Sequence, residues 1–260
     1  MRAPAGLLAG ILGLAWVSSG VSAFGGDDVR LADYFGFLPL EVYKLDNRIN
    51  GLVIRDFDGD KIEDIAVINN GRSRIDLLLS TPRTGDDADF GEPDKAKDKE
   101  VNKISSDRRM RLVSVPVNKE VVSLQAGDFD GDGKLDLVYY GTPAGIEILH
   151  NKGGGKFGDI KKINTGEAIE APGSLAVGDL DNDGRSDLAL ITKDEILLMF
   201  QREKGKLGEI ERLPHTLENP RMVKILDLDG NGLADLVMLD GGEADPIRVR
   251  FATEKGKHGP

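Results

Sequence analysis

Four short segments of the chain carry closely spaced aspartates that could bind a hard metal ion. Each has the pattern Asp-x-Asp-x-Asp/Asn-x-x-x-Asp, which puts oxygen ligands at loop positions 1, 3, 5 and 9. Calcium takes about six to eight oxygen ligands, and crowded carboxylates repel one another unless a cation or protons intervene. The residues at these positions are Asp56, Asp58, Asp60 and Asp64; Asp128, Asp130, Asp132 and Asp136; Asp179, Asp181, Asp183 and Asp187; and Asp227, Asp229, Asn231 and Asp235.

A fifth ligand is expected from the backbone carbonyl at loop position 7. The residues there have no side-chain oxygen: they are Ile62, Lys134, Arg185 and Leu233. Glycine at most of positions 4 and 6 allows positive φ without steric cost. The first loop instead has Lys61 at position 6, where positive φ costs a residue with a Cβ about 1–2 kcal/mol. We predict up to four calcium ions, with the first loop as the weakest site.

An EF-hand loop is the main alternative metal site, and the sequence argues against it. That loop requires a Glu at position 12 and a helix on either side. Position 12 lies inside a β-type run in every copy. The other alternative is a set of Asp- and Gly-rich surface turns without an ion, because both residues favour turns. Four copies with shared ligand positions favour metal binding. The position-12 residues are Val67, Tyr139, Leu190 and Met238.

The Asp loops belong to a repeat of about 50 residues. Their first aspartates lie 72, 51 and 48 residues apart, and the long first interval contains residues 84–110, a charged segment interpreted as a surface-loop insertion. Each loop precedes a β-type run and, after a short turn, a second run; a third strand and the strand leading into the next loop complete the unit. The first two runs of each unit are residues 65–68 and 75–80, 137–140 and 146–151, 188–191 and 196–201, and 236–239 and 247–251.

These units predict an all-β fold. About four short strands in about 50 residues match one blade of a β-propeller, so four blades of antiparallel strands are visible. The apolar residue at loop position 2 is expected to point into the core and anchor its loop. These residues are Phe57, Phe129, Leu180 and Leu228.

The N-terminus has the features of a secretory signal peptide. Arg2 precedes an apolar run of 11 residues, Leu7–Val17, and small residues stand before a predicted cleavage point after Ala23. We therefore expect residues 1–23 to be removed and residues 24–260 to form a secreted, periplasmic or cell-surface domain without a membrane span. Cysteine is absent, so a structural metal rather than disulfides is expected to stabilise this exported domain.

The composition argues against a nucleic-acid partner, and no motif indicates an enzyme. The net charge is −11 and the pI is about 4.9, whereas phosphate binding calls for a basic patch. His150, His215 and His258 show no pairing with a local metal or nucleophile motif. Hydrolase, metalloprotease and phosphate-loop motifs are also absent. We predict a protein without catalytic residues, although a carboxylate pair acting on polysaccharides could be hidden among the Asp loops.

The Asp loops resemble those of the FG-GAP/VCBS repeat family, the calcium-loop propeller repeats of integrin α-chain heads and many bacterial secreted proteins. The "FG" signature stands at Phe35-Gly36, Phe90-Gly91 and Phe157-Gly158, and it is altered at Leu207-Gly208 and His258-Gly259. The resemblance covers the chain from Phe35 onward. It implies calcium at the loop residues named above and a binding or adhesion module for an extracellular protein or carbohydrate.

The resemblance leaves two questions open. Family members also occur as noncatalytic propeller portions of larger secreted hydrolases or lyases that act on polysaccharides. Propellers of this family usually have six or seven blades, so the four visible units are either a closed four-bladed ring or part of a larger propeller. An open propeller edge would allow self-association.

Overall fold

The all-β prediction is confirmed. The structure, a computed structural model, describes residues 42–81, 109–203, 205–242, 246–254 and 257–258, and these contain strands and no helix. The chain divides into two compact units, Met1–Tyr43 and Lys44–Pro260, and every strand among the described residues lies in the second. The predicted signal peptide, the first two "FG" pairs and nearly all of the predicted insertion lie outside the described residues.

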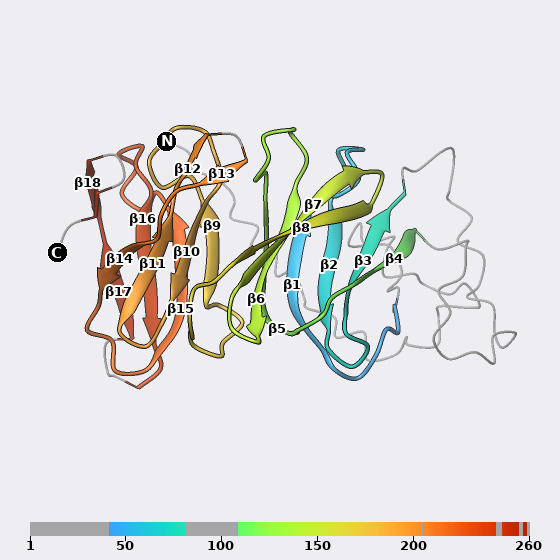
Figure 1. Ribbon diagram of the computed structural model, residues 1–260, viewed down its shortest axis with the longest axis horizontal. Coiled ribbons are helices and arrows are strands. Elements are labelled where there is room, and N and C mark those ends of the chain that lie inside the picture. Colours follow the sequence, from blue (N-terminus) through green and yellow to red (C-terminus); the bar gives the residue numbers. More distant parts are fainter. Residues whose placement is uncertain (1–41, 82–108, 204, 243–245, 255–256, 259–260) are drawn as a thin grey trace, which may run out of the picture. The chain divides into compact units, whose positions relative to one another are not determined.

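Four antiparallel sheets follow one another along the chain and form the four blades of a β-propeller (Figure 1). The first three blades have four strands each, and the last has three among the described residues. Two short hairpins extend the third and fourth blades. The strands are β1 (Ile49–Arg55), β2 (Asp64–Asn69), β3 (Arg74–Ser80) and β4 (Met110–Pro116) in blade 1; β5 (Glu120–Gly127), β6 (Asp136–Thr142), β7 (Ile146–Gly153) and β8 (Lys156–Ile163) in blade 2; β9 (Leu175–Gly178), β10 (Asp187–Ile191), β11 (Glu195–Met199) and β14 (Glu211–Pro214) in blade 3; β15 (Pro220–Leu226), β16 (Asp235–Asp240) and β17 (Ile247–Arg250) in blade 4; and the hairpins β12 (Gln201–Glu203) with β13 (Lys206–Leu207) and β18 (Ala252–Glu254) with β19 (Lys257–His258).

The strand that leads into each Asp loop pairs with the strand that follows the same loop. β1 pairs with β2 so that Arg55 lies opposite Asp64, and β5 pairs with β6 so that Gly127 lies opposite Asp136. In the repeat unit expected from the sequence, the strand that leads into each Asp loop is the last strand of the preceding unit. The pairing shows instead that each Asp loop connects the first two strands of one blade.

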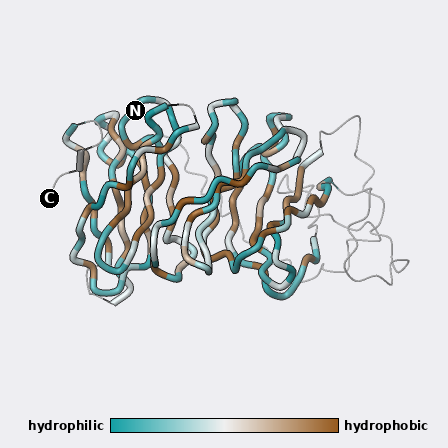
Figure 2. Tube along the Cα trace, viewed as in Figure 1, coloured by the Kyte–Doolittle hydropathy of each residue, from teal (hydrophilic) through white to brown (hydrophobic). Residues whose placement is uncertain are grey.

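The hydrophobic core lies between neighbouring blades. Apolar residues concentrate on the strands, and the loops at the blade ends are largely polar (Figure 2). One cluster joins Phe57 and Leu77 of blade 1 to Leu137 of blade 2, and comparable clusters join blades 2 and 3 and blades 3 and 4. β1, β5, β9 and β15 contact one another in chain order. The first three Asp loops are therefore each held against the blade that comes next in the chain.

The loop residue at position 2 is buried in three blades and exposed in the fourth. Phe57, Phe129 and Leu180 are at most 2 % exposed and lie in the clusters between blades, which confirms the prediction for them. Leu228 is 50 % exposed, so the prediction is wrong for the last loop. Its three counterparts are covered by the following blade, and no described residue covers Leu228 in that way.

Candidate metal centres

The backbone of each Asp loop is a tight turn that uses positive φ at positions 4 and 6. Position 4 has φ between 54° and 89° in the four loops, and position 6 has φ between 71° and 86°. Lys61 adopts φ 71° although it is not a glycine, as the sequence predicted. Asn182, with φ 54°, is the other exception, and Asn tolerates this region better than most residues. These residues are Gly59, Gly131, Asn182 and Gly230 at position 4, and Lys61, Gly133, Gly184 and Gly232 at position 6.

The position-1 aspartate holds this turn in shape. Asp128 accepts hydrogen bonds from the backbone N–H groups of Gly131 at 2.6 Å and Gly133 at 3.0 Å. Asp56 and Asp227 make the same two contacts in their own loops. Each loop is thus folded by its own carboxylate, which explains why a short Asp- and Gly-rich segment suffices.

The position-9 aspartate is buried and fastens the loop to the sheet. Asp136 is fully buried and accepts the backbone N–H of Phe129 at 3.0 Å and that of Asn151 at 2.8 Å. The position-9 aspartates of the other three loops also accept two backbone N–H groups, one of which is that of the position-2 residue of the same loop. The other donor lies at or just beyond the end of the third strand of the blade; the donors are Ser80, Gln201 and Ala252. This carboxylate therefore joins the loop to the third strand of the blade.

Burial makes these carboxylates costly to ionise without a cation. Desolvation raises the pKa of Asp64 and of Asp136 above the usual value for aspartate, against the lowering effect of their backbone hydrogen bonds. For Asp187, desolvation raises the pKa to about 6, and the charges of Asp181 and Asp183 add to this effect. A bound cation would favour the ionised form of these groups.

The structure brings three of the predicted ligand side chains together in every loop. Carboxylate oxygens from positions 1, 3 and 9 lie within 4.8 Å of one another in the first, third and fourth loops, and those of positions 1, 3 and 5 do so in the second. The position-5 residues of the other three loops lie outside these groups; each accepts a hydrogen bond from the backbone N–H at position 7. These three residues are Asp60, Asp183 and Asn231.

The donor sets fit a hard cation. Asp181 Oδ1 is buried and lacks a hydrogen-bond partner among the described residues, inside a group of three converging carboxylates. A buried carboxylate oxygen without a partner is costly unless an ion or water satisfies it. In the second and third loops, positively charged side chains approach the aspartates: Lys134 contacts Asp132, and Arg202 contacts Asp181 at 2.8 Å.

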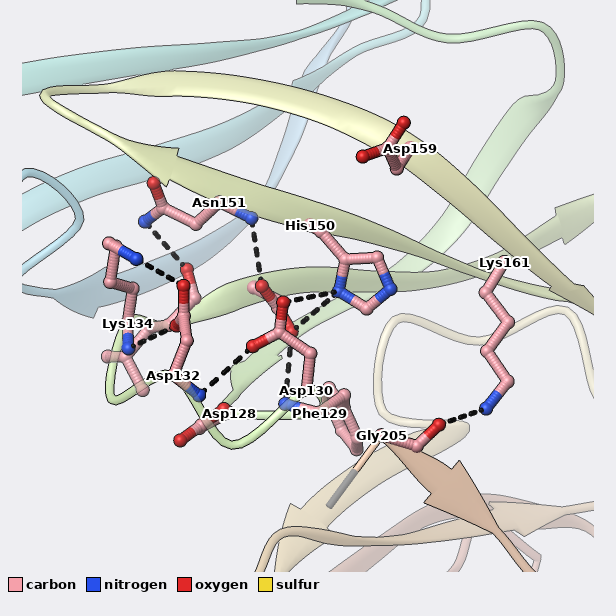
Figure 3. Close-up of polar contacts among 12 residues, drawn as sticks. Asp128, Phe129, Asp130, Asp132, Lys134, His150, Asn151, Asp159, Lys161 and Gly205 are labelled. Atoms are coloured by element: carbon pink, nitrogen blue, oxygen red, sulfur yellow. Dashed lines mark hydrogen bonds and ion pairs between the residues drawn. The ribbon is translucent and has the colours of Figure 1, made fainter.

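His150 lies at the second loop, which sequence reasoning missed. Its Nδ1 is 3.1 Å from Asp136 Oδ2 and 3.6 Å from Asp130 Oδ2, so the prediction that no histidine pairs with a metal motif is wrong for this residue (Figure 3). The repeat contained a signal for His150, because the residues aligned with it in the other three units are all apolar: Leu79, Phe200 and Phe251. A polar residue in an otherwise apolar column of the repeat marks a local difference.

Two amide side chains tie Asp loops to the following blade. Asn151 Nδ2 donates to the carbonyl oxygen of Phe57 at 2.8 Å and to that of Leu135 at 3.0 Å. Gln201 Nε2 donates to the carbonyl oxygen of Asp128 at 3.0 Å. Asn151 and Gln201 occupy the same position in their blades and are at most 2 % exposed. Blades 2 and 3 therefore each fix the Asp loop of the preceding blade.

A shallow cavity of about 500 Å³ lies where the segments before β9 and β15 meet the turn between β10 and β11. Its polar lining includes Glu170, Lys193, Glu218, Asn219 and Arg221. The buried carboxylate of Asp240 accepts the backbone N–H groups of Glu218 and Asn219, at 2.8 and 3.1 Å. A Cβ built on Gly241 would lie 2.6 Å from Arg221 Nε, so Arg221 packs closely over this glycine. One edge of the cavity is thus positioned by the last blade.

The fold and the repeated Asp loops define a β-propeller with candidate metal loops. The family model described as FG-GAP-like repeat matches residues 128–190 and 179–238. Residues 128–238 therefore belong to the FG-GAP-like repeat family, which confirms the resemblance inferred from the loops.

One of the similar solved structures, with a TM-score above 0.5, supports the fold. An Agrocybe aegerita lectin, described as recognising non-reducing terminal N-acetylglucosamine, aligns at 18 % identity and a TM-score of 0.52 over 80 % of this chain and 50 % of the lectin chain. A Photorhabdus luminescens Tc holotoxin pore aligns at 16 % identity and a TM-score of 0.46, over 76 % of this chain and 9 % of that one. This chain thus spans about half the length of the lectin. No curated protein matches the sequence. Among the described residues, there is no helix of the length and apolarity that would span a membrane.

Proposed function

We propose that the protein is an exported, calcium-stabilised β-propeller that binds glycans and has no catalytic role. The observation that carries the metal part of the proposal is the convergence of carboxylates within 4.8 Å in all four Asp loops. Each ion would be held by the side chains at positions 1, 3, 5 and 9 and by the carbonyl of Ile62, Lys134, Arg185 or Leu233. Calcium, when bound, supplies positive charge that offsets the mutual repulsion of these carboxylates.

The cavity between blades 3 and 4 is the site that we propose for the glycan. Sugars present hydroxyl groups that both donate and accept, and the cavity offers carboxylates, an amide and a guanidinium close together. The backbone of Glu218 and Asn219 is fixed by Asp240, which limits the entropy lost when a ligand binds. The lectin that shares this fold makes a glycan the first ligand class to test.

Calcium would act on this site indirectly. The third and fourth Asp loops connect strands of the two blades that line the cavity, so their rigidity contributes to its shape. Glycan affinity is therefore expected to fall when calcium is removed, although no loop ligand lines the cavity. Export of the mature chain after cleavage at Ala23 is part of the same proposal, because millimolar calcium is an extracellular condition that suits loops of this kind.

A glycan array probed with and without calcium tests this proposal. We expect binding to a defined group of glycans in calcium, with a loss of at least about 10-fold in affinity for Arg221→Ala, as expected for a hydrogen bond from a charged group. Arg212→Ala is the matched control, since Arg212 is exposed and pairs with Glu195 outside the cavity. The proposal fails if no glycan binds in calcium, or if both arginine variants bind like the unaltered protein.

A second measurement separates binding from catalysis. The protein is incubated with each bound glycan and with acidic polysaccharides, and the reducing ends and unsaturated products are quantified. We expect no product above the background of a boiled sample. Turnover that disappears when an Asp-loop residue is replaced would contradict the noncatalytic part of the proposal.

A further inference from the structure

The same pair of positions is buried in the hydrophobic cluster at each interface between neighbouring blades. The loop residue at position 2 of one blade shares a hydrophobic cluster with the residue four places before the loop of the next blade. The pairs are Phe57 with Leu124, Phe129 with Leu175, and Leu180 with Val223. All six side chains are at most 4 % exposed. The interface between blades is therefore a repeated head-to-tail contact.

The first and last blades each leave one half of this contact uncovered. Leu228 is the position-2 residue of blade 4 and is 50 % exposed, while Leu52 stands four places before the loop of blade 1 and is 62 % exposed. At each of the three interfaces between neighbouring blades, the residues at these two positions are both buried. No described residue buries either of them.

A second pair of positions is close at the interface between blades 2 and 3 and at the interface between blades 3 and 4. A Cβ on Gly127, directly before the second loop, would lie 2.8 Å from the side chain of Val177 in blade 3. Gly178 is equally close to Ile225 in blade 4, at 2.5 Å. The corresponding residues at the uncovered faces are Leu226 and Ile54, which are 40 % and 44 % exposed.

The exposed apolar residues form one face on the last blade and another on the first blade. The last blade presents Leu226, Leu228, Ile247 and Phe251, of which Ile247 corresponds to fully buried residues in the other three blades. The first blade presents Leu52 and Ile54 on the strand that would receive a preceding blade. Apolar side chains gathered on a surface in this way indicate an interaction site.

We propose that these two faces bind each other between two copies of the chain, so that blade 4 of one copy packs on blade 1 of the next. Each copy has, on blade 4 and on blade 1, the two sets of residues that are buried together between its own neighbouring blades. A second copy of the chain therefore offers the surface that each exposed face is built to contact. The contact is heterologous, and such contacts close into a ring or continue as a filament.

Light scattering coupled to size exclusion measures the association state of the full chain over a wide range of concentration. We expect the unaltered protein to associate, and Leu52→Asp and Leu228→Asp each to weaken association at least about 10-fold, because a carboxylate is costly to bury in an apolar contact. Ile160→Asp is the matched control: Ile160 is 44 % exposed on β8, away from both faces, and this variant should associate normally. Circular dichroism melts verify that all three variants fold.

Cross-linking tests the direction of the contact without disturbing the charge of either face. The chain has no cysteine, so Leu52→Cys and Leu228→Cys each introduce one thiol. A short bifunctional maleimide should link the two variants when they are mixed and link neither variant with itself. A monomer at all concentrations, association that both aspartate variants retain, or equal linking of one variant with itself would each overturn the proposal. These outcomes do not depend on glycan binding, since the two faces lie outside the cavity.

Discussion

At the residue scale, the aspartates of one loop have two separate tasks. The position-9 aspartate is buried, and its oxygens accept two backbone hydrogen bonds, so it is part of the sheet even without an ion. The position-3 aspartate is less buried and belongs to the groups of oxygens that converge in each loop. Substitutions at the two positions should therefore have different effects in the presence of a chelator.

Replacing Asp136 or Asp130 tests this division. In chelator, Asp136→Ala should lower the free energy of unfolding by about 2–5 kcal/mol, because two buried N–H groups lose their acceptor. Asp130→Ala should change it by less than about 1 kcal/mol in chelator, and should remove the calcium-dependent gain contributed by the second loop. Urea denaturation with and without calcium measures both. Equal losses for the two variants in chelator would contradict separate roles.

Lys61 is strained at its present φ of 71°. Lys61→Gly should therefore raise the free energy of unfolding by about 1 kcal/mol in chelator, and it should strengthen calcium binding at the first loop. Lys61→Ala is the control, because it removes the charge and keeps the Cβ that causes the strain. If the alanine variant gained as much stability as the glycine variant, charge rather than backbone strain would be the cause.

At the scale of strands and blades, the first two Asp loops are each joined to the next blade by a single amide side chain. Asn151→Ala should cost about 1–3 kcal/mol, since the buried carbonyls of Phe57 and Leu135 lose a donor. Hydrogen exchange should show the loss of protection at the first loop, in the blade before the substitution. Asn118→Ala, at an exposed position, is the control and should leave exchange unchanged. Faster exchange confined to blade 2 would contradict the tie between blades.

The sequence contains enough information to predict the loops and most strands, since both are local patterns. Positive φ at Lys61 and burial of Phe57 follow from the repeat alone. Contacts across the sheet depend on residues that are distant in the chain and were not predicted: His150 meets Asp136, and Asn151 reaches Phe57 across 94 positions. The exposure of Leu228 was also missed, because an alignment of equivalent positions does not show that this position is uncovered in blade 4 of the described structure.

At the scale of the whole molecule, export has a simple optical signature. Trp16 is the only tryptophan and lies within the predicted signal peptide. Protein purified after export should therefore show tyrosine-like emission, and protein retaining residues 1–23 should show tryptophan-like emission. Mass spectrometry of the exported chain provides the matching N-terminus. Tryptophan-like emission from the exported chain would mean that cleavage at Ala23 is wrong.

Stabilisation by calcium would explain why carboxylates converge in all four Asp loops of a chain that has no cysteine to form disulfides. Ions that bind only the folded state stabilise it by about 1.4 kcal/mol per site when calcium is ten-fold above its dissociation constant. Several sites should together raise the melting temperature by roughly 5–15 °C.

The most direct test compares thermal melts in chelator, in millimolar calcium and in magnesium, all at equal ionic strength. We predict a clearly higher midpoint in calcium than in chelator, with a smaller effect of magnesium, and a reduced calcium effect when Asp130 and Asp181 are both replaced by alanine. Equal midpoints in calcium and chelator would contradict stabilisation of the fold by calcium.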